Sequence, residues 1–119
     1  MVAVVKPALL IVDDEVALAN LLKQFLERLG YRAEVCTQSS AALELLQANP
    51  VAYAVLVADL AMPEINGEEL IEKAQTLNPK LRAILTSGYA HRARQPGVVF
   101  LQKPFAPKAL AEEIERMLK

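Results

Sequence analysis

The segment Ala8-Leu9-Leu10-Ile11-Val12-Asp13-Asp14 carries the pattern that decides the fold, five apolar residues followed directly by two acids. A short continuous apolar run is typical of a strand that is buried on both faces, as in a parallel sheet. Leucine and phenylalanine side chains then recur three and four positions apart between Leu18 and Leu29, which predicts one face of a helix. Gly30 follows as a helix stop signal. This part of the chain therefore predicts a strand that leads into a helix.

The same alternation of strand and helix continues to the end of the chain. The further predicted strands are residues 32–36, 54–58, 82–86 and 98–102. Ser39 or Ser40 is expected to cap the second helix. Asn66 with Glu69 resembles a capping box, and Pro107 suits the first turn of the last helix. Short connections between alternating strands and helices predict parallel strands with right-handed crossovers, and hence a three-layer α/β sandwich with a five-stranded parallel sheet.

The connection between the fourth and fifth predicted strands is too short for an ordinary helix. If the fifth strand begins at Val98, residues 88–97 remain for the whole crossover, which normally needs at least about 10–12 residues including its helix. Gly88, Pro96 and Gly97 shorten the helical part further. We therefore expect a fourth helix of one or two turns, or none.

Length and composition exclude several classes of protein. The chain has 119 residues, of which 54% are hydrophobic and 23% charged, so residues 1–119 are expected to form one folded domain. Its 13 basic and 14 acidic side chains lack the basic excess of a nucleic-acid binder. No apolar run approaches the roughly 20 residues that span a bilayer, and the start is unlike a signal peptide. One cysteine and one histidine cannot build a zinc site. We expect a cytoplasmic domain that binds neither nucleic acid nor membrane.

All three aspartates of the chain stand at the carboxyl end of a predicted strand. Asp13 and Asp14 follow the first strand, and Asp59 follows the third. In sheets of this kind the functional crevice lies beyond the carboxyl ends of the strands. Three carboxylates in one crevice repel one another, and Mg²⁺, which prefers oxygen ligands, would relieve that repulsion. The sequence therefore predicts a magnesium site at this edge of the sheet.

A hydroxyl and an ammonium group are expected at the same edge. Ser87 ends the fourth predicted strand, and Lys103 ends the fifth. Beside a metal–carboxylate cluster, such groups can hold the oxygens of a phosphoryl group, whose transfer depends mostly on positioning and charge neutralisation. An aspartate can act as the nucleophile and form an acyl phosphate. The residues at this edge therefore point to phosphoryl transfer.

Four motifs in order resemble the receiver domains of two-component response regulators, and the resemblance covers nearly the whole chain. It implies a flavodoxin-like strand order, 2-1-3-4-5, and a signalling phosphoacceptor rather than an enzyme. The motifs are Leu10-Ile11-Val12-Asp13-Asp14-Glu15, Val57-Ala58-Asp59-Leu60-Ala61-Met62-Pro63 through Gly67, Thr86-Ser87-Gly88-Tyr89, and Phe100-Leu101-Gln102-Lys103-Pro104-Phe105.

The resemblance also implies a role for each residue at the strand ends. Asp59 would accept a phosphoryl group from the phosphohistidine of a histidine kinase or histidine phosphotransfer domain. Ser87 and Lys103 would hold the phosphate, and Ser87 with Phe100 would form the conformational switch. The implied Mg²⁺ ligands are Asp13 or Asp14, Asp59 and the backbone carbonyl of Ala61.

Ordinary structural roles compete with these assignments. Asp14 is also a candidate N-cap for the first helix, and Lys103 could simply extend from a strand end towards solvent. Phe100 could be a plain core residue. Thr86 competes with Ser87 as the phosphate-binding hydroxyl, but side chains alternate along a strand, so Thr86 should point to the other face.

Two backbone features are expected near the site. Gly67 is expected to allow a backbone turn, and the resemblance implies a cis bond between Lys103 and Pro104.

Two other functions share the expected fold. A Mg²⁺-dependent phosphohydrolase of the haloacid dehalogenase type also uses an aspartyl nucleophile, but it needs a second acid at the position of Ala61 and a cap domain over its substrate. A flavodoxin-like carrier would bind the FMN phosphate in the loop after the first strand, where Asp13-Asp14-Glu15 would repel it. The phosphohydrolase stays as the alternative.

The short connection before the fifth strand bears on assembly. Receivers of transcription factors mostly dimerise through the fourth helix, the fifth strand and the fifth helix, whereas this shorter connection is similar to that of receivers attached to hybrid sensor kinases. We therefore expect a monomer. Its histidine kinase or phosphotransfer partner is expected to dock beside the acidic crevice, on the first helix and the Lys103-Pro104-Phe105 loop.

Overall fold

The computed structural model describes residues 7–90 and 95–119. Its strands are β1 (Ala8–Val12), β2 (Arg32–Cys36), β3 (Val55–Asp59), β4 (Arg82–Ser87) and β5 (Val98–Gln102). Its helices are α1 (Val16–Arg28), α2 (Ser39–Ala48), α3 (Gly67–Leu77) and α4 (Pro107–Met117). All strand pairs are parallel, and the strand order is β2-β1-β3-β4-β5. The predicted order is confirmed.

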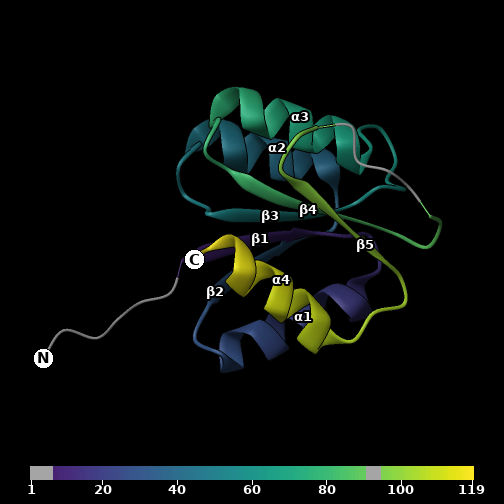
Figure 1. Cartoon of the computed structure of the whole chain (residues 1–119). Coiled ribbons are helices and arrows are strands. Elements are labelled where there is room, and N and C mark those ends of the chain that lie inside the picture. The colour runs from purple at the N-terminus through teal and green to yellow at the C-terminus, as the bar shows by residue number, and fades with distance from the viewer. Residues whose placement is uncertain (1–6, 91–94) are drawn as a thin grey trace, which may run out of the picture.

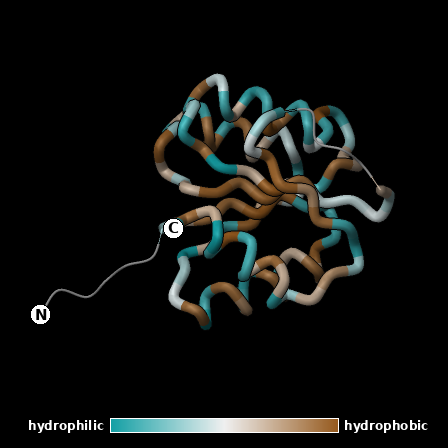
Figure 2. The backbone as a smooth tube through the Cα atoms, in the orientation of Figure 1, coloured by the Kyte–Doolittle hydropathy of each residue, from teal (hydrophilic) through white to brown (hydrophobic). Residues whose placement is uncertain are grey.

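The sheet lies between two layers of helices. In Figure 1, α2 and α3 cover one face of the sheet, and α1 and α4 cover the other. Figure 2 shows that the strands between these layers are the most hydrophobic part of the backbone trace. The predicted three-layer α/β sandwich is therefore confirmed.

The central strands contribute side chains to both layers of the core. Leu10 and Leu56 pack in the cluster that includes the inner faces of α2 and α3. Leu9 and Ile11 pack in the cluster that includes α1 and α4. Because successive side chains point to opposite faces, a strand that is covered on both sides needs apolar residues at every position. This requirement explains the uninterrupted apolar run at the start of the chain.

Two strands extend one residue further than predicted. The third ends at Asp59 and not at Ala58, and the fourth ends at Ser87 and not at Thr86. Asp59 is the register partner of Thr86, and Ser87 is the partner of Gln102. The ladder therefore holds the backbone of both predicted site residues in place.

The prediction for the start of α2 is wrong. The N-cap position is occupied by Gln38, whose side chain makes no capping hydrogen bond, and the helix already includes Ser39. The buried hydroxyl of Ser39 instead donates a hydrogen bond of 3.1 Å to the carbonyl of Pro63. Neither Ser39 nor Ser40 caps the helix, because Ser39 is used in a tertiary contact and Ser40 lies one residue further inside.

The other predicted helix starts are observed. The Asn66 side chain accepts a hydrogen bond of 2.8 Å from the Glu69 amide, and the Glu69 side chain accepts one of 3.3 Å from the Asn66 amide. Pro107 lies in the first turn of α4. The alternative role of Asp14 as a cap is not observed, because Glu15 occupies the N-cap position of α1.

The connection between β4 and β5 contains no helix in its described residues, 88–90 and 95–97. The four positions between these two stretches lie outside the described residues. The crossover helix is shortened or missing, as predicted, so α4 in Figure 1 is the helix that follows β5.

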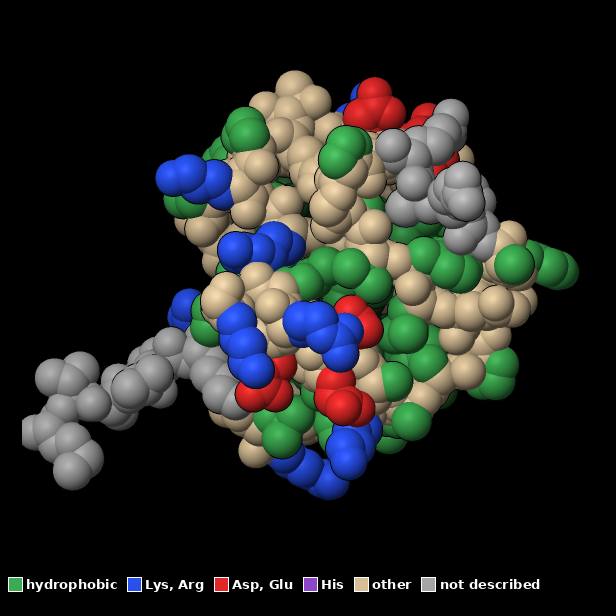
Figure 3. All heavy atoms as spheres, in the orientation of Figure 1, with side chains coloured by type: hydrophobic (Ala, Val, Ile, Leu, Met, Phe, Trp, Pro, Cys, Tyr) green, Lys and Arg blue, Asp and Glu red, His purple; other side chains and the backbone are tan. Residues whose placement is uncertain are grey.

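Charges of both signs are mixed on the surface. Over α4 and next to it, basic and acidic side chains lie side by side on the face that Figure 3 shows. Within residues 7–90 and 95–119, no helix has both the length and the apolar character that crossing a membrane requires.

Candidate functional site

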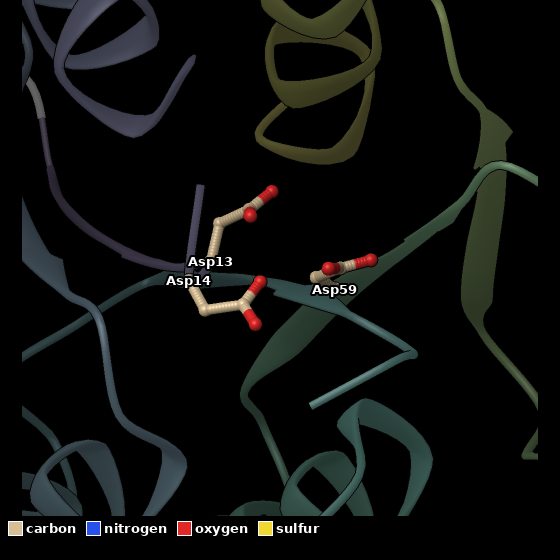
Figure 4. A group of neighbouring side chains, drawn as sticks. All are labelled: Asp13, Asp14 and Asp59. Atoms are coloured by element: carbon tan, nitrogen blue, oxygen red, sulfur yellow. The ribbon is translucent and has the colours of Figure 1, made fainter. Parts of the chain in front are cut away.

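The parallel topology brings the three aspartates to one edge of the sheet. Asp13 and Asp14 directly follow β1, and Asp59 is the last residue of the neighbouring strand β3, as Figure 4 shows. Each offers a carboxylate oxygen, and these oxygens lie within 4.8 Å of one another. Asp13 and Asp59 are buried, whereas Asp14 is exposed. The cluster therefore opens to solvent on the side of Asp14.

Lys103 reaches the same cluster from the end of β5. Its Nζ donates a hydrogen bond of 2.8 Å to Asp13 Oδ2 and one of 3.1 Å to Glu15 Oε1. The distance from Nζ to Asp59 Oδ2 is 3.5 Å. Lys103 is therefore held by Asp13 and Glu15 and lies within ion-pair distance of Asp59, so it does not simply extend into solvent.

The electrostatics of the cluster leave Asp59 poorly compensated. Burial, together with the neighbouring Asp13 carboxylate, raises the pKa of Asp59 to about 6, although Lys103 opposes the rise. Burial by itself would lower the pKa of Lys103, but its hydrogen bonds to the Asp13 and Glu15 carboxylates outweigh this effect and raise that pKa to about 12. The site thus holds a permanent cation beside an excess of negative charge that a further cation would neutralise.

Ser87 ends β4, which lies on the other side of β3 from β1 and the acids that follow it. With Asp59, Ala61 and Lys103 it lines a pocket of about 570 Å³. Its hydroxyl accepts a hydrogen bond of 3.1 Å from the Tyr89 amide. The Ser87 side chain is buried at the base of this pocket and not on the protein surface.

The competing hydroxyl of Thr86 does not line the pocket. Thr86 precedes Ser87 in the strand, so its side chain points to the other face, as predicted. Its backbone carbonyl accepts a hydrogen bond of 2.8 Å from the Leu60 amide, which ties β4 to the start of the loop after β3.

Backbone contacts also fix the loop that carries Lys103. The Lys103 amide donates a hydrogen bond of 2.7 Å to the carbonyl of Ser87. The peptide bond between Lys103 and Pro104 is cis, which confirms the expectation.

Close packing requires a glycine at position 67. Its φ is not positive, so the expected backbone turn does not need the left-handed conformation that favours glycine. A Cβ atom built at this position would lie 2.3 Å from the carbonyl oxygen of Asp59. Only a residue without a side chain lets α3 begin this close to the phosphoacceptor candidate.

Phe100 lies on β5, opposite Leu85 of β4. Its partly buried ring packs against the core cluster on the α2–α3 side of the sheet. The ring therefore has the packing of a core residue, and its function as a switch stays a prediction.

Residues 9–115 match the sequence profile described as "Response regulator receiver domain". This match covers most of the chain. The chain belongs to the response regulator receiver domain family. It is thus a signalling module of two-component systems, as the motifs at the strand ends indicated.

Curated relatives of this receiver domain include proteins of similar length. The response regulator receiver protein CpdR of Brucella abortus is 32% identical, over 92% of this chain and 95% of its own length. Chemotaxis protein CheY1 of Helicobacter pylori is 34% identical, over 92% of this chain and 95% of its own length. The sensor kinase CckA of Brucella abortus is 30% identical, but the match spans only 12% of that longer protein.

Solved structures agree with this assignment. The receiver domain of the hybrid histidine kinase CckA has a TM-score of 0.85 at 30% identity, over 94% of this chain and 99% of that one. A CheY-like receiver domain from Methanospirillum hungatei has a TM-score of 0.87 at 30% identity, over 94% and 93% of the two chains. The receiver domain is therefore similar both to stand-alone regulators and to a receiver within a kinase.

The sequence analysis missed Glu15 as a site residue. It was considered only within a motif and as part of the acidic loop that would repel an FMN phosphate, yet its carboxylate contacts Lys103. The signal that could have found it is its place directly after two strand-end acids. That position puts it at the same edge of the sheet as Lys103.

Proposed function

We propose that this receiver domain accepts a phosphoryl group on Asp59 from a phosphohistidine, in a reaction that requires Mg²⁺, and that this modification switches its conformation. The observation that carries the proposal is the convergence of Asp59, Ser87 and Lys103 in one pocket beside the acids of β1. The domain acts as a phosphoacceptor, which promotes only its own phosphorylation and dephosphorylation.

The acidic cluster fits a hard divalent cation. The oxygens of Asp13, Asp14 and Asp59 are close enough to share one ion. Burial, together with the Asp13 carboxylate, raises the pKa of Asp59, so a cation bound there would stabilise its charged form. The backbone carbonyl of Ala61, which lies on the same pocket, is the remaining proposed protein ligand. A bound Mg²⁺ would supply positive charge next to the phosphoryl oxygens. It would also keep water molecules as some of its ligands.

The proposed transfer is a displacement at phosphorus. A carboxylate oxygen of Asp59 forms the new bond to phosphorus while the bond from phosphorus to the donor's imidazole nitrogen breaks. The nitrogen keeps the electron pair and takes a proton from solvent, and the product is an aspartyl phosphate. The Lys103 ammonium and the Ser87 hydroxyl donate hydrogen bonds to the phosphoryl oxygens. Lys103 Nζ lies 3.5 Å from Asp59 Oδ2.

The same pocket supports the proposed mode of partner docking. Besides its polar residues, the pocket is lined by Leu18 of α1 and by Pro104 and Phe105 after β5. An apolar rim around a reactive carboxylate suits a helical partner that presents its phosphohistidine into the pocket. We propose that a histidine kinase or histidine phosphotransfer domain binds at this rim.

The phosphohydrolase alternative is less favoured. The position two residues after the nucleophile candidate is Ala61, whose methyl group cannot act as a proton donor. A phosphohydrolase would also turn over small phosphate esters many times per chain. A receiver domain would retain the phosphoryl group on Asp59 and release it slowly.

The proposal is tested by phosphorylation with a small donor. Acetyl phosphate with Mg²⁺ is expected to add one phosphoryl group to the wild-type domain and none to Asp59→Asn, as measured by intact-mass spectrometry. Excess EDTA is expected to abolish the modification. Glu112→Gln, which changes an exposed acid of α4, serves as a matched control and should be modified like the wild type. A phosphoryl adduct that persists in Asp59→Asn would overturn the assignment.

A further inference from the structure

The side chain of Glu15 does not cap the helix at whose start it stands. Glu15 occupies the N-cap position of α1, but its side chain makes no capping hydrogen bond. The carboxylate instead reaches Lys103 Nζ at 3.1 Å, across 88 positions of sequence. It is 62% exposed and lies at the mouth of the pocket that contains Asp59 and Ser87. The side chain is therefore directed to the functional lysine and not to its own helix.

Glu15 and Asp59 have unequal access to the ammonium group. A lysine has three N–H donors. Asp13 and Glu15 accept hydrogen bonds of 2.8 and 3.1 Å, whereas the oxygen of Asp59 stays at 3.5 Å. A phosphoryl group that arrives at Asp59 needs donors from Lys103 for its own oxygens. Among these acceptors Glu15 is the exposed one, so it is the one that can be displaced at low cost.

The negative charge of Glu15 also disfavours phosphorylation, because it repels an incoming phosphodonor. A phosphodonor that enters the pocket carries negative charge past the Glu15 carboxylate, and like charges a few ångströms apart repel even near solvent. Removing this carboxylate charge would therefore lower the repulsion and free Lys103 at the same time.

We propose that Glu15 is a positioning and specificity-determining residue, which holds Lys103 back from Asp59 and disfavours small, highly charged phosphodonors. The inference rests on the proposed function of Asp59. A protein donor brings its phosphohistidine with a docking surface whose contacts offset the repulsion, whereas a small anion has no such compensation. Glu15 thereby restrains phosphorylation by free metabolic phosphate compounds.

The experiment compares two small donors at saturating Mg²⁺ and neutral pH. Acetyl phosphate is mostly a dianion under these conditions, and phosphoramidate is mostly a monoanion. Glu15→Gln is expected to raise the second-order rate constant of phosphorylation by acetyl phosphate by about three- to tenfold, the effect of one unit charge at this kind of distance near a surface. The gain with phosphoramidate should be smaller, and salt should reduce both gains.

Glu27→Gln is the matched control. Glu27 is an exposed acid at the other end of α1, so the substitution makes the same charge change on the same helix. It is expected to leave both rate constants unchanged. Glu15→Ala removes the hydrogen-bond acceptor as well as the charge, so any additional gain over Glu15→Gln measures the release of Lys103.

The outcomes separate this inference from the proposed function. Equal rate constants for the wild type, Glu15→Gln and Glu27→Gln would overturn the role of Glu15, even though Asp59 is still modified. A gain of the same size with both donors and at every salt concentration would also overturn it, because a general structural change does not depend on donor charge. If none of the proteins is modified at Asp59, the proposed function itself fails.

Discussion

The charge of the Asp59 carboxylate is unfavourable when no metal ion is bound. Asp59 is 6% exposed, and burial beside Asp13 raises its pKa to about 6 from the usual 3.8. Between these two values the folded protein binds more protons than the unfolded chain, so this group makes the free energy of unfolding fall as the pH rises. The penalty is absent below about pH 4 and complete above about pH 7.

We therefore predict that Asp59→Asn stabilises the metal-free domain near pH 7.5. A pKa rise of this size corresponds to at most about 3 kcal/mol, so a gain of about 1–3 kcal/mol in the free energy of unfolding is expected. Urea titrations of both proteins in EDTA at several pH values measure it. The difference should shrink as the pH is lowered through 6 and vanish near pH 4. A constant difference across this range would contradict the role of the Asp59 charge.

We predict that two side chains at the pocket control the lifetime of the proposed phosphorylated state. Hydrolysis needs a water that is aligned opposite Asp59, and the residues beside that path are Ala61 and Tyr89, which both line the pocket. Ala61 cannot hydrogen-bond to a water, and Tyr89 is bulky and largely exposed at the pocket mouth. We predict slow loss of the phosphoryl group.

Ala61→Asn or Tyr89→Glu should accelerate this loss several-fold, because each introduces a polar group that can align the water. The decay is measured by intact-mass spectrometry after the donor is removed. Glu112→Gln again provides the unchanged reference. Decay at the wild-type rate in both variants would show that these positions do not control the water.

The start of α3 packs closely against the end of β3 at the site. The start of α3 is fixed by the Asn66–Glu69 capping box, and its first residue, Gly67, lies against the backbone carbonyl of Asp59. Since a Cβ atom there would be 2.3 Å from that oxygen, the helix or the strand end must move to accept any side chain. We therefore expect a change at Gly67 to shift the backbone of Asp59.

Gly67→Ala is predicted to lower the free energy of unfolding by about 1–3 kcal/mol, the usual cost of forcing extra atoms into a packed contact. It should also slow phosphorylation of Asp59 by acetyl phosphate, because the carboxylate shifts with its backbone. Gly88→Ala is the matched control, since a Cβ atom there meets nothing within 4 Å. Equal stability and equal rates for the two variants would contradict the packing argument.

At the scale of the whole molecule, the short β4–β5 connection alters the face that receivers of transcription factors mostly use for dimerisation. The described residues of this connection form no helix, and the neighbouring α4 carries exposed charges of both signs, Glu112 and Arg116 among them. We predict that phosphorylation does not produce a dimer through this face.

Sedimentation velocity with and without beryllofluoride, a mimic of the phosphoryl group, tests this prediction. The domain should sediment as a monomer in both states. The charge reversals Glu112→Lys and Arg116→Glu test whether any dimer that forms uses this face. A shift from monomer to dimer on addition of the mimic, abolished by either charge reversal, would show that the face functions despite the short connection.

The order of helices and strands was predictable because it depends on local periodicity. The apolar run before Asp13 and the helical spacing from Leu18 each indicate which surface of the element must be buried. Parallel topology then places the carboxyl end of every strand at one edge of the sheet. For this reason the sequence alone was enough to assign Asp13, Asp59 and Lys103 to one site. The same reasoning failed for Ser39, since its hydroxyl satisfies a distant carbonyl and does not cap its own helix.

The sequence by itself therefore determined the fold class, the location of the site and the residue types within it, because spacing and strand-end position are local properties of the chain. Only the tertiary structure decided which atoms meet. The contact of Glu15 with Lys103 and the packing of Gly67 on Asp59 join residues from different elements. Such contacts depend on how helices cross the sheet and on which rotamers the crowded edge allows, and no local pattern in the sequence encodes either.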